Sequence, residues 1–253
     1  MERETLFIAF STQKGGVGKT AFTVLLSSYM HYLDGKSIAV IDCDFPQHSI
    51  MEMRKRDSGL VISDPFYKRM AYNQFKVISK KAYPVIGSNP IDAIQDAEKL
   101  IAESEERIDI VFFDLPGTMN SKGVVKTLRE MDYIFSPISA DRLVLASTLS
   151  FAASLNENLI TVGKSNIKAL YLFWTMVDAR EKTPLYDAYV DTIEELGLSI
   201  LKTHIPDTKR FRREMDETHR AFFRSTAFPP DKQLIKGSNI DELVREIYQI
   251  IKV

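Results

Sequence analysis

Short apolar runs alternate with longer amphipathic stretches along most of the chain. Seven runs are rich in β-branched and aromatic residues, which is typical of β-strands. They span residues 5–11, 37–42, 83–87, 108–114, 133–137, 168–175 and 199–204. The stretches in which apolar residues recur at helical spacing are 19–33, 90–105, 142–159, 185–196 and 240–251. This alternation predicts an α/β fold with a doubly wound, mostly parallel sheet covered by helices.

The predicted strands are apolar on both faces. Residues 38–41 read Ile-Ala-Val-Ile and residues 110–113 read Ile-Val-Phe-Phe, as expected when helices cover both faces of a sheet. No internal repeat, low-complexity segment or Ser/Gly linker interrupts the alternation. We therefore expect one domain over residues 1–253.

Two segments depart from this alternation. Residues 57–81 carry many charged and aromatic residues between the second and third predicted strands, and we expect an additional helical excursion there. Residues 209–231 are rich in arginine and end in Pro229 and Pro230, and we expect a basic helical segment. These two segments should hold what distinguishes this protein from others of its fold.

Composition narrows the class of protein. Of the 253 residues, 45% are hydrophobic and 26% are charged, which fits a soluble globular protein and excludes disordered, collagen-like and coiled-coil classes. The 33 Lys and Arg residues and 34 Asp and Glu residues leave a formal net charge of −1. This balance argues against a generally basic coat for nucleic acid, so any such contact must come from a local patch.

The cysteine count and the absence of long apolar stretches indicate in which cellular compartment the protein is found. Cys43 is the only cysteine, which excludes an intrachain disulfide framework and any metal or iron–sulfur site built from several cysteines of one chain. This low cysteine count favours a reducing compartment for the protein. The apolar segment 5–10 is too short for a signal peptide, and no stretch approaches the 18 apolar residues of a membrane span. We expect a soluble, cytoplasmic protein.

A glycine-rich loop lies between the first predicted strand and the first predicted helix. It reads Lys14-Gly15-Gly16-Val17-Gly18-Lys19-Thr20. Its glycines allow the backbone to wrap a phosphate chain, with N–H groups and the helix N-terminus aimed at the negative charge. Lys19 is expected to reach the β- and γ-phosphates and Thr20 to ligate Mg²⁺. The ordinary pattern has glycine five residues before Gly18, where this chain has Gln13.

Carboxylates stand at the ends of two predicted strands. Asp42 and Asp44 close the strand 37–42, and Asp114 closes the strand 108–114. The carboxyl ends of parallel strands border the crevice in which such sheets bind ligands. An apolar strand that ends in Asp is the Walker B arrangement, in which Asp114 binds Mg²⁺ through water, and the following Pro116 and Gly117 are typical of a switch that senses the γ-phosphate.

The glycine-rich loop resembles the deviant Walker A loop of the ParA/MinD family of ATPases, which are P-loop NTPases with a signature lysine at the position of Lys14. The resemblance implies an ATP sandwich dimer in which Lys14 reaches the nucleotide of the partner subunit. A cation supplied in trans makes catalysis conditional on association. It also implies that residues 15–21 bind ATP, a set consisting of Gly15, Gly16, Val17, Gly18, Lys19, Thr20 and Ala21.

The strand 37–42 and its continuation are similar to the family's second acidic motif, Asp-x-Asp-Pro-Gln. The resemblance implies that Asp44 polarises the attacking water and that Asp42 supports the Mg²⁺ shell. This chain departs from the motif because Phe45 is inserted before Pro46 and Gln47. The effect of the insertion on the register of Asp44 is left open.

Adenine is favoured over guanine, because the Asn-Lys-x-Asp string of P-loop GTPases does not occur. Residues 175–180 resemble the family's Thr-Met-x-Asp-x-Arg segment. Ile205, Pro206 and Asp207 resemble the Ile-Pro turn that lies against adenine. Pro206 and Asp207 are therefore candidate nucleotide-binding residues.

The resemblance to the ParA branch implies an ATPase that dimerises on ATP, binds DNA without sequence preference and hydrolyses ATP slowly until a partner protein stimulates it. The DNA would be a plasmid, a chromosome or a conjugative element. Residues 202–224 hold seven basic and four acidic residues, a local charge of +3. Helical spacing of apolar residues there would leave four arginines facing solvent for phosphate contacts, namely Arg212, Arg213, Arg220 and Arg224. A solvated face with local ion pairs is an equal alternative.

Other branches of the family fit less well. A MinD-like positioning ATPase needs a basic amphipathic membrane anchor, whereas the charges of the helix 240–251 and Lys252 sum to −1, so we expect a core helix and no membrane contact. An iron–sulfur carrier needs ligating cysteines, which Cys43 alone does not supply. A small-molecule ATP-dependent ligase on the same fold stays an alternative.

Overall fold

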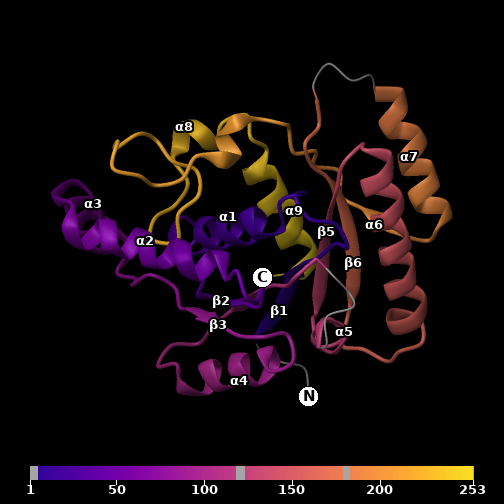
Figure 1. Cartoon of the computed structure of the whole chain (residues 1–253), viewed down its shortest axis with the longest axis horizontal. Coiled ribbons are helices and arrows are strands. Elements are labelled where there is room, and N and C mark those ends of the chain that lie inside the picture. The colour runs from indigo at the N-terminus through magenta and orange to yellow at the C-terminus, as the bar shows by residue number, and fades with distance from the viewer. Residues whose placement is uncertain (1–4, 118–122, 179–182, 253) are drawn as a thin grey trace.

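The computed structural model describes residues 5–117, 123–178 and 183–252. They form a seven-stranded sheet in which every neighbouring pair is parallel, in the order β3-β2-β4-β1-β5-β6-β7 (Figure 1). The strands are Leu6–Phe10, Ile38–Asp42, Val85–Gly87, Ile110–Asp114, Tyr133–Ile138, Ala169–Trp174 and Ser199–Ile200, numbered β1 to β7. All seven predicted strands are present, with ends that differ by up to four residues.

Helices cover both faces of the sheet, as predicted. The helices are α1 Lys19–Tyr32, α2 Ser49–Ser63, α3 Pro65–Ile78, α4 Ala93–Glu103, α5 Val124–Leu128, α6 Arg142–Leu155, α7 Thr183–Glu195, α8 Lys232–Ile235 and α9 Ile240–Ile251. On β1, Ile8 and Phe10 pack with α1 and α9, whereas Phe7 and Ala9 pack with helices α4 to α7. This alternation explains why the strands are apolar on both faces.

The register of the sheet brings the ends of three strands level. Asp114 at the end of β4 pairs with Asp42 at the end of β2 and with Phe10 at the end of β1. The loop that follows β1 therefore begins beside both aspartates. This edge is the crevice in which doubly wound sheets bind ligands.

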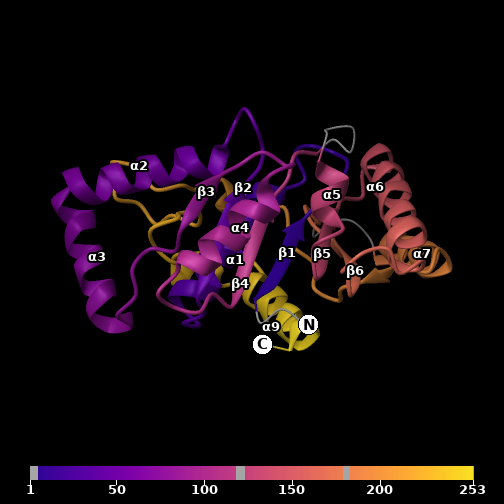
Figure 2. The same ribbon diagram turned by 90° about the horizontal axis from the view of Figure 1, so that it is seen from below.

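The predicted excursion 57–81 consists of two helices. α2 and α3 extend from one end of the molecule, at the left of Figures 1 and 2. The break between them lies at Asp64, whose carboxylate accepts a hydrogen bond from the Phe66 N–H at 2.8 Å. Pro65 at the first position of α3 fits this cap because it has no N–H to satisfy.

The prediction of a basic helix over residues 209–231 is wrong. Only Lys209–Arg212 forms a short 3-10 turn, and the remainder is irregular up to α8. Met215, Phe222 and Phe228 are buried against Tyr67 of α3. The apolar spacing thus serves docking onto α3 rather than one face of a helix, and long-range packing overrides the local pattern.

One helix is long and apolar enough to cross a membrane by length and composition, although the sequence analysis expects none. It spans Arg142–Ile160, comprising α6 and the π-helical turn Asn156–Ile160, with a mean hydropathy of 1.2, and 28% of it is buried. In this fold Leu145, Phe151 and Leu155 of α6 are buried in the core beside the sheet. A helix that covers a parallel sheet passes the same test.

Candidate functional site

The glycine-rich loop connects β1 directly to α1, in the predicted position. Gly18 caps α1 with a left-handed backbone, φ 101°, and a Cβ atom there would lie 3.0 Å from the Phe22 ring. A side chain at this position is therefore both strained and crowded. The N-terminus of α1 opens onto the loop without an acidic residue in its first turn, so it is free to attract an anion.

Lys19 is the first residue of α1 and turns back over the loop. Its Nζ donates a hydrogen bond to the Lys14 carbonyl at 3.1 Å. A Cβ at Gly117 would lie 3.1 Å from this Nζ, so the loop after β4 passes close to it. Burial lowers the pKa of Lys19, while Asp114 and Asp44 act against that shift. Phosphate oxygens beside the ammonium would offset the cost of burying it.

Asp114 is a buried carboxylate with one hydrogen-bond partner among the described residues. One of its oxygens accepts a hydrogen bond from the Thr20 hydroxyl at 2.7 Å, whereas Oδ1 is buried and has no partner in residues 5–117, 123–178 or 183–252. Burial raises the pKa of Asp114 to about 7, with Asp42 and Asp44 adding to the shift and Thr20 opposing it. Such a carboxylate is stabilised by a cation at the orphaned oxygen.

These two oxygen donors fit Mg²⁺. In proteins that ion is commonly held by one or two side chains together with substrate phosphates and water. Over the described ranges, no three His, Cys, Asp or Glu side chains form an all-protein metal cage. Thr20 and Asp114 thus provide a partial shell beside the place where the loop would hold phosphates.

Asp42 has a different position from the one predicted for a metal-shell residue. Its Oδ2 accepts hydrogen bonds from the N–H groups of Ile50 and Met51, at 2.9 and 3.0 Å, and its Oδ1 accepts one from the Asp44 N–H at 3.3 Å. The fully buried carboxylate therefore satisfies the free donors at the start of α2. It holds α2 and Asp44 in place next to Asp114.

Asp44 lies two residues after the end of β2, within electrostatic reach of Lys19 and Asp114. The N–H groups of Gln47 and His48 close a turn on the Asp44 carbonyl, at 2.8 and 2.9 Å, and Phe45 projects outward with 67% of its surface exposed. The half-buried Asp44 carboxylate interacts electrostatically with Lys19 and Asp114. In the part of the chain that is described, no side-chain or backbone donor binds this carboxylate, so it is available to water.

Lys14 is exposed at the outer side of the loop. Its carbonyl accepts from Lys19, but its ammonium makes no hydrogen bond or ion pair with residues 5–117, 123–178 or 183–252. The two lysines of the loop therefore differ: Lys19 is folded back over it, and Lys14 extends away.

A cavity of about 210 Å³ lies at the side of the loop, where Val177 pairs with Pro206. The Asp207 N–H donates to the Val177 carbonyl at 3.0 Å, which fixes the predicted turn. The walls come from the loop, the start of α1, the end of β6 and the segment after β7. Arg180, predicted in the same neighbourhood, lies outside the described residues.

Two of the four arginines predicted to face DNA, Arg212 and Arg224, also line this cavity. Arg224 is half-buried, whereas Arg212, Arg213 and Arg220 are exposed. Sequence reasoning missed the position of Arg224 because the helix from which it was inferred does not form. It also missed Thr208, which lines the same cavity and whose buried hydroxyl has no hydrogen-bond partner among the described residues.

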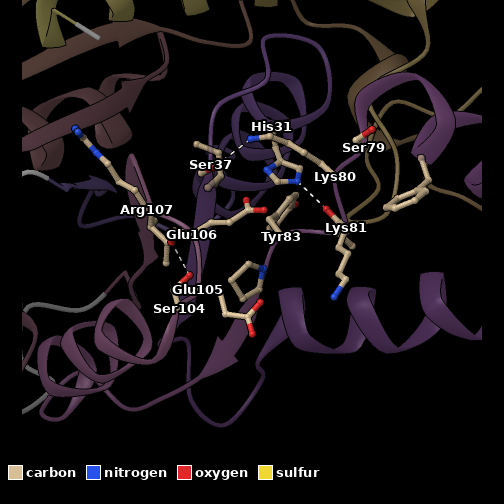
Figure 3. A pocket seen from close by; sticks show the side chains of 15 residues that line it. His31, Ser37, Ser79, Lys80, Lys81, Tyr83, Ser104, Glu105, Glu106 and Arg107 are labelled. Carbon is tan, nitrogen blue, oxygen red and sulfur yellow. Dashed lines mark hydrogen bonds between the residues drawn. The ribbon is translucent and has the colours of Figure 1, made fainter.

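A second cavity, of about 340 Å³, lies at the opposite end of the sheet and contains no predicted site residue (Figure 3). The ring nitrogens of His31 contact the carbonyls of Lys36 and Lys81 at 3.0 and 2.8 Å. Burial lowers the pKa of His31, and the two carbonyls oppose the shift. Here the ring ties α1 to the two segments that lead into β2 and β3.

Comparison with known proteins decides the family. A model of the CobQ/CobB/MinD/ParA nucleotide binding domain matches residues 8–220. The chain belongs to this family. It is a nucleotide-binding ATPase of the ParA/MinD group.

The family relatives include partition proteins. The chromosome-partitioning ATPase Soj of Thermus thermophilus is 27% identical over 188 residues, which cover 68% of this chain and 70% of Soj. A putative plasmid partition protein of Borrelia burgdorferi, bound to AMPPNP, superposes with a TM-score of 0.61 at 15% identity, covering 98% and 100% of the two chains. The pNOB8 ParA bound to nonspecific DNA gives 0.58 at 16% identity, covering 98% and 99%. The family members therefore share the fold of this chain at low identity.

Proposed function

We propose that the protein is a ParA-like Mg²⁺-ATPase that dimerises on ATP and then binds DNA without sequence preference, to partition or maintain a plasmid, a chromosome or a conjugative element. The observation that carries the proposal is the pair of loop lysines. Lys19 is placed to serve the phosphates of its own subunit, and the unpartnered, exposed Lys14 is free to serve those of another.

Each residue of the edge has a task in this reaction. Thr20 and Asp114 would hold Mg²⁺, which when bound neutralises charge on the β- and γ-phosphate oxygens. Lys19 binds the same phosphates, and the Asp44 carboxylate accepts a hydrogen bond from the attacking water and orients it. Asp42 positions Asp44 through its N–H. Hydrolysis is slow in one subunit alone, because the cation that completes the charge balance is Lys14 of the partner.

The test of this proposal is Lys14→Ala, with Lys99→Ala on α4 as a matched exposed control. We expect Lys14→Ala to keep MgATP binding while it loses ATP-dependent dimerisation in sedimentation experiments and at least tenfold in turnover. Lys99→Ala should behave as the wild type. If Lys14→Ala dimerises and turns over normally, the sandwich mechanism is wrong.

DNA binding is supported by the pNOB8 ParA complex with nonspecific DNA and by the predicted arginines that are exposed to solvent, Arg212, Arg213 and Arg220. Phosphate contacts make affinity fall steeply with salt. We expect the double variant Arg213→Glu/Arg220→Glu to reduce ATP-dependent DNA retention at low salt and to lower the salt dependence. Retention equal to the wild type would place the DNA surface elsewhere.

The membrane-positioning alternative is disfavoured by α9. Its apolar residues are already buried against α1 and the sheet, and the set comprises Ile240, Leu243, Val244, Ile247 and Ile251. An anchor of this kind would have to leave the core to reach lipid. Flotation with anionic liposomes and MgATP should leave the protein unbound.

A further inference from the structure

Arg224 lies where two cavities of the nucleotide edge meet. Arg224 lines the cavity beside Pro206 and also an open cavity of about 630 Å³. The open cavity is lined by Thr20, Gln47, Ser49, Glu52, Met53, Arg56, Glu214 and Arg224. Among the described lining residues, Arg224 is the one that both cavities share. Arg224 therefore borders both the Pro206 end and the Thr20 end of the site.

A chain of charged groups holds this guanidinium. Nη2 of Arg224 donates to Glu214 at 2.5 Å, and the other oxygen of Glu214 accepts from Arg56. Arg56 in turn donates to the fully buried Asp57 at 2.9 and 3.2 Å. The Glu214–Arg224 backbone pairing and the Arg224 N–H bond to the Arg213 carbonyl, at 3.0 Å, fix the main chain as well.

Glu214 holds the Arg224 guanidinium in place, but some of its N–H groups have no hydrogen-bond acceptor among the described residues. Glu214 engages Nη2, whereas Nη1 and Nε donate to no residue of the described ranges, and Nε is buried. Burial lowers the pKa of Arg224, with Glu214 opposing and Arg56 adding to the shift. Thr208 also lines the cavity beside Pro206, and its buried Oγ1 has no hydrogen-bond partner among the described residues. Buried donors of native proteins nearly always have acceptors, so two residues of this wall keep hydrogen-bonding capacity that a ligand could use.

The position on the loop tells which part of that ligand is involved. Gly18 and Ala21 line the cavity beside Pro206, and Thr20 lines the other. If adenine lies at Pro206 and the β- and γ-phosphates at Lys19 and Thr20, the group between them is the α-phosphate. Guanidinium binds phosphate oxygens with strong, charge-assisted hydrogen bonds.

We propose that Arg224 is a nucleotide-binding residue that donates to the α-phosphate of the bound nucleotide, with Glu214 and Arg56 as its positioning residues. The inference rests on the proposed ATP site. AMP, ADP and ATP share the α-phosphate, so Arg224 contributes to binding of all three and leaves the hydrolytic step to Lys19, Asp44 and Lys14. It also links bound nucleotide to residues 213–228 and, through Arg56, to α2.

The experiment compares Arg224→Ala and the charge-conserving Arg224→Lys with Arg69→Ala, which removes an exposed arginine of α3. Dissociation constants for adenosine, AMP, MgADP and MgATP are measured by calorimetric titration, and KM and kcat by phosphate release. For Arg224→Ala we expect about tenfold weaker binding of every phosphorylated ligand, adenosine binding within twofold of wild type, a raised KM and an unchanged kcat. Arg224→Lys should recover part of the affinity, and Arg69→Ala should match the wild type.

Several outcomes overturn the inference. Unchanged MgADP and AMP affinity in Arg224→Ala would show that the guanidinium does not bind nucleotide. An equal loss for adenosine and ADP would assign Arg224 a purely structural role. If Arg224→Ala does not fold, Glu214→Gln serves instead, because it keeps the arginine but removes the carboxylate that holds it. We expect this variant to weaken AMP and ADP binding about threefold. Unchanged binding of AMP and ADP in Glu214→Gln would contradict the proposal. A wild-type protein that binds no MgATP would instead refute the proposed ATPase function itself.

Discussion

Asp57 and Asp114 are both buried carboxylates, but the protein surrounds them in opposite ways. Asp57 in α2 accepts hydrogen bonds from Arg56, from the Ser225 hydroxyl and from both the N–H and the hydroxyl of Thr226. Asp114 accepts one from the Thr20 hydroxyl, and its second oxygen has no partner in the described part of the chain. A carboxylate that the chain satisfies completely holds structure together, whereas one left incomplete is ready for a cation.

The difference reflects what each region has to do. The Asp57 region joins α2 and α3 to residues 213–228, so its polar groups must be satisfied in the resting protein. In the proposed function the edge around Asp114 receives phosphates and Mg²⁺, so its charges would be balanced only when these are bound. The unbalanced charge therefore raises the free energy of the ligand-free protein.

The largest expected effect is the loss of stability in Asp57→Ala. This change leaves the Thr226 N–H and the Arg56 guanidinium without their buried acceptor, which we expect to cost about 3–5 kcal/mol of unfolding free energy. Urea unfolding followed by the fluorescence of Trp174 measures it. Glu217→Ala, an exposed acid on the docked segment, should stay within about 0.5 kcal/mol of wild type. If Asp57→Ala lowers the unfolding free energy by less than about 1 kcal/mol, Asp57 does not have the structural role that distinguishes it from Asp114.

Asp114→Asn is expected to act in the opposite direction. The amide removes a buried charge that lacks a partner, so the ligand-free protein should gain on the order of 1 kcal/mol, or about 2–4 °C in Tm. The same change should abolish the stabilisation that MgATP adds, because the cation loses its carboxylate. Thermal unfolding with and without MgATP records both effects. A lower Tm without ligand would mean that Asp114 has a structural role like that of Asp57.

His31 should give the smallest effect, and it appears only in acid. Its pKa is lowered by burial in the folded state, so the unfolded chain takes up the proton first as the pH falls. The stability that a neutral His31 supports is complete above its unfolded pKa near 6.5 and declines below it. We expect His31→Gln to flatten the decline of stability between pH 7 and 5 relative to pH 8. Parallel pH profiles for the two proteins would show that other groups cause the decline.

Local sequence was sufficient where the deciding contacts are local. Gly18, Lys19 and Thr20 follow a strand and open a helix, so their loop geometry depends on neighbouring residues. The positions of Asp42 and Asp114 required one further step, the parallel pairing of β2 and β4, and apolar patterning is enough to predict such a sheet. The family resemblance of this edge has the same local origin.

The segment 209–231 shows where local reasoning fails. Its apolar spacing fits a helix, yet Met215 and Phe222 pack on α3, and Ser225 and Thr226 bind Asp57 about 170 residues away along the chain. A spacing rule carries no information about a surface supplied by such a distant segment. Arg224 therefore lies half-buried beside Glu214 and not on the solvent face of a helix.

The sequence by itself therefore determined the seven-stranded α/β fold, the loop of residues 14–20 and the carboxylates at two strand ends. Only the tertiary structure decided that Asp42 caps α2, that Asp44 lies near Lys19 and Asp114, and that Arg224 lines two cavities beside the glycine-rich loop. The physical reason is the range of the interactions. Strand and loop geometry arises from neighbouring residues, whereas burial, charge balance and orphaned donors depend on which distant segments meet.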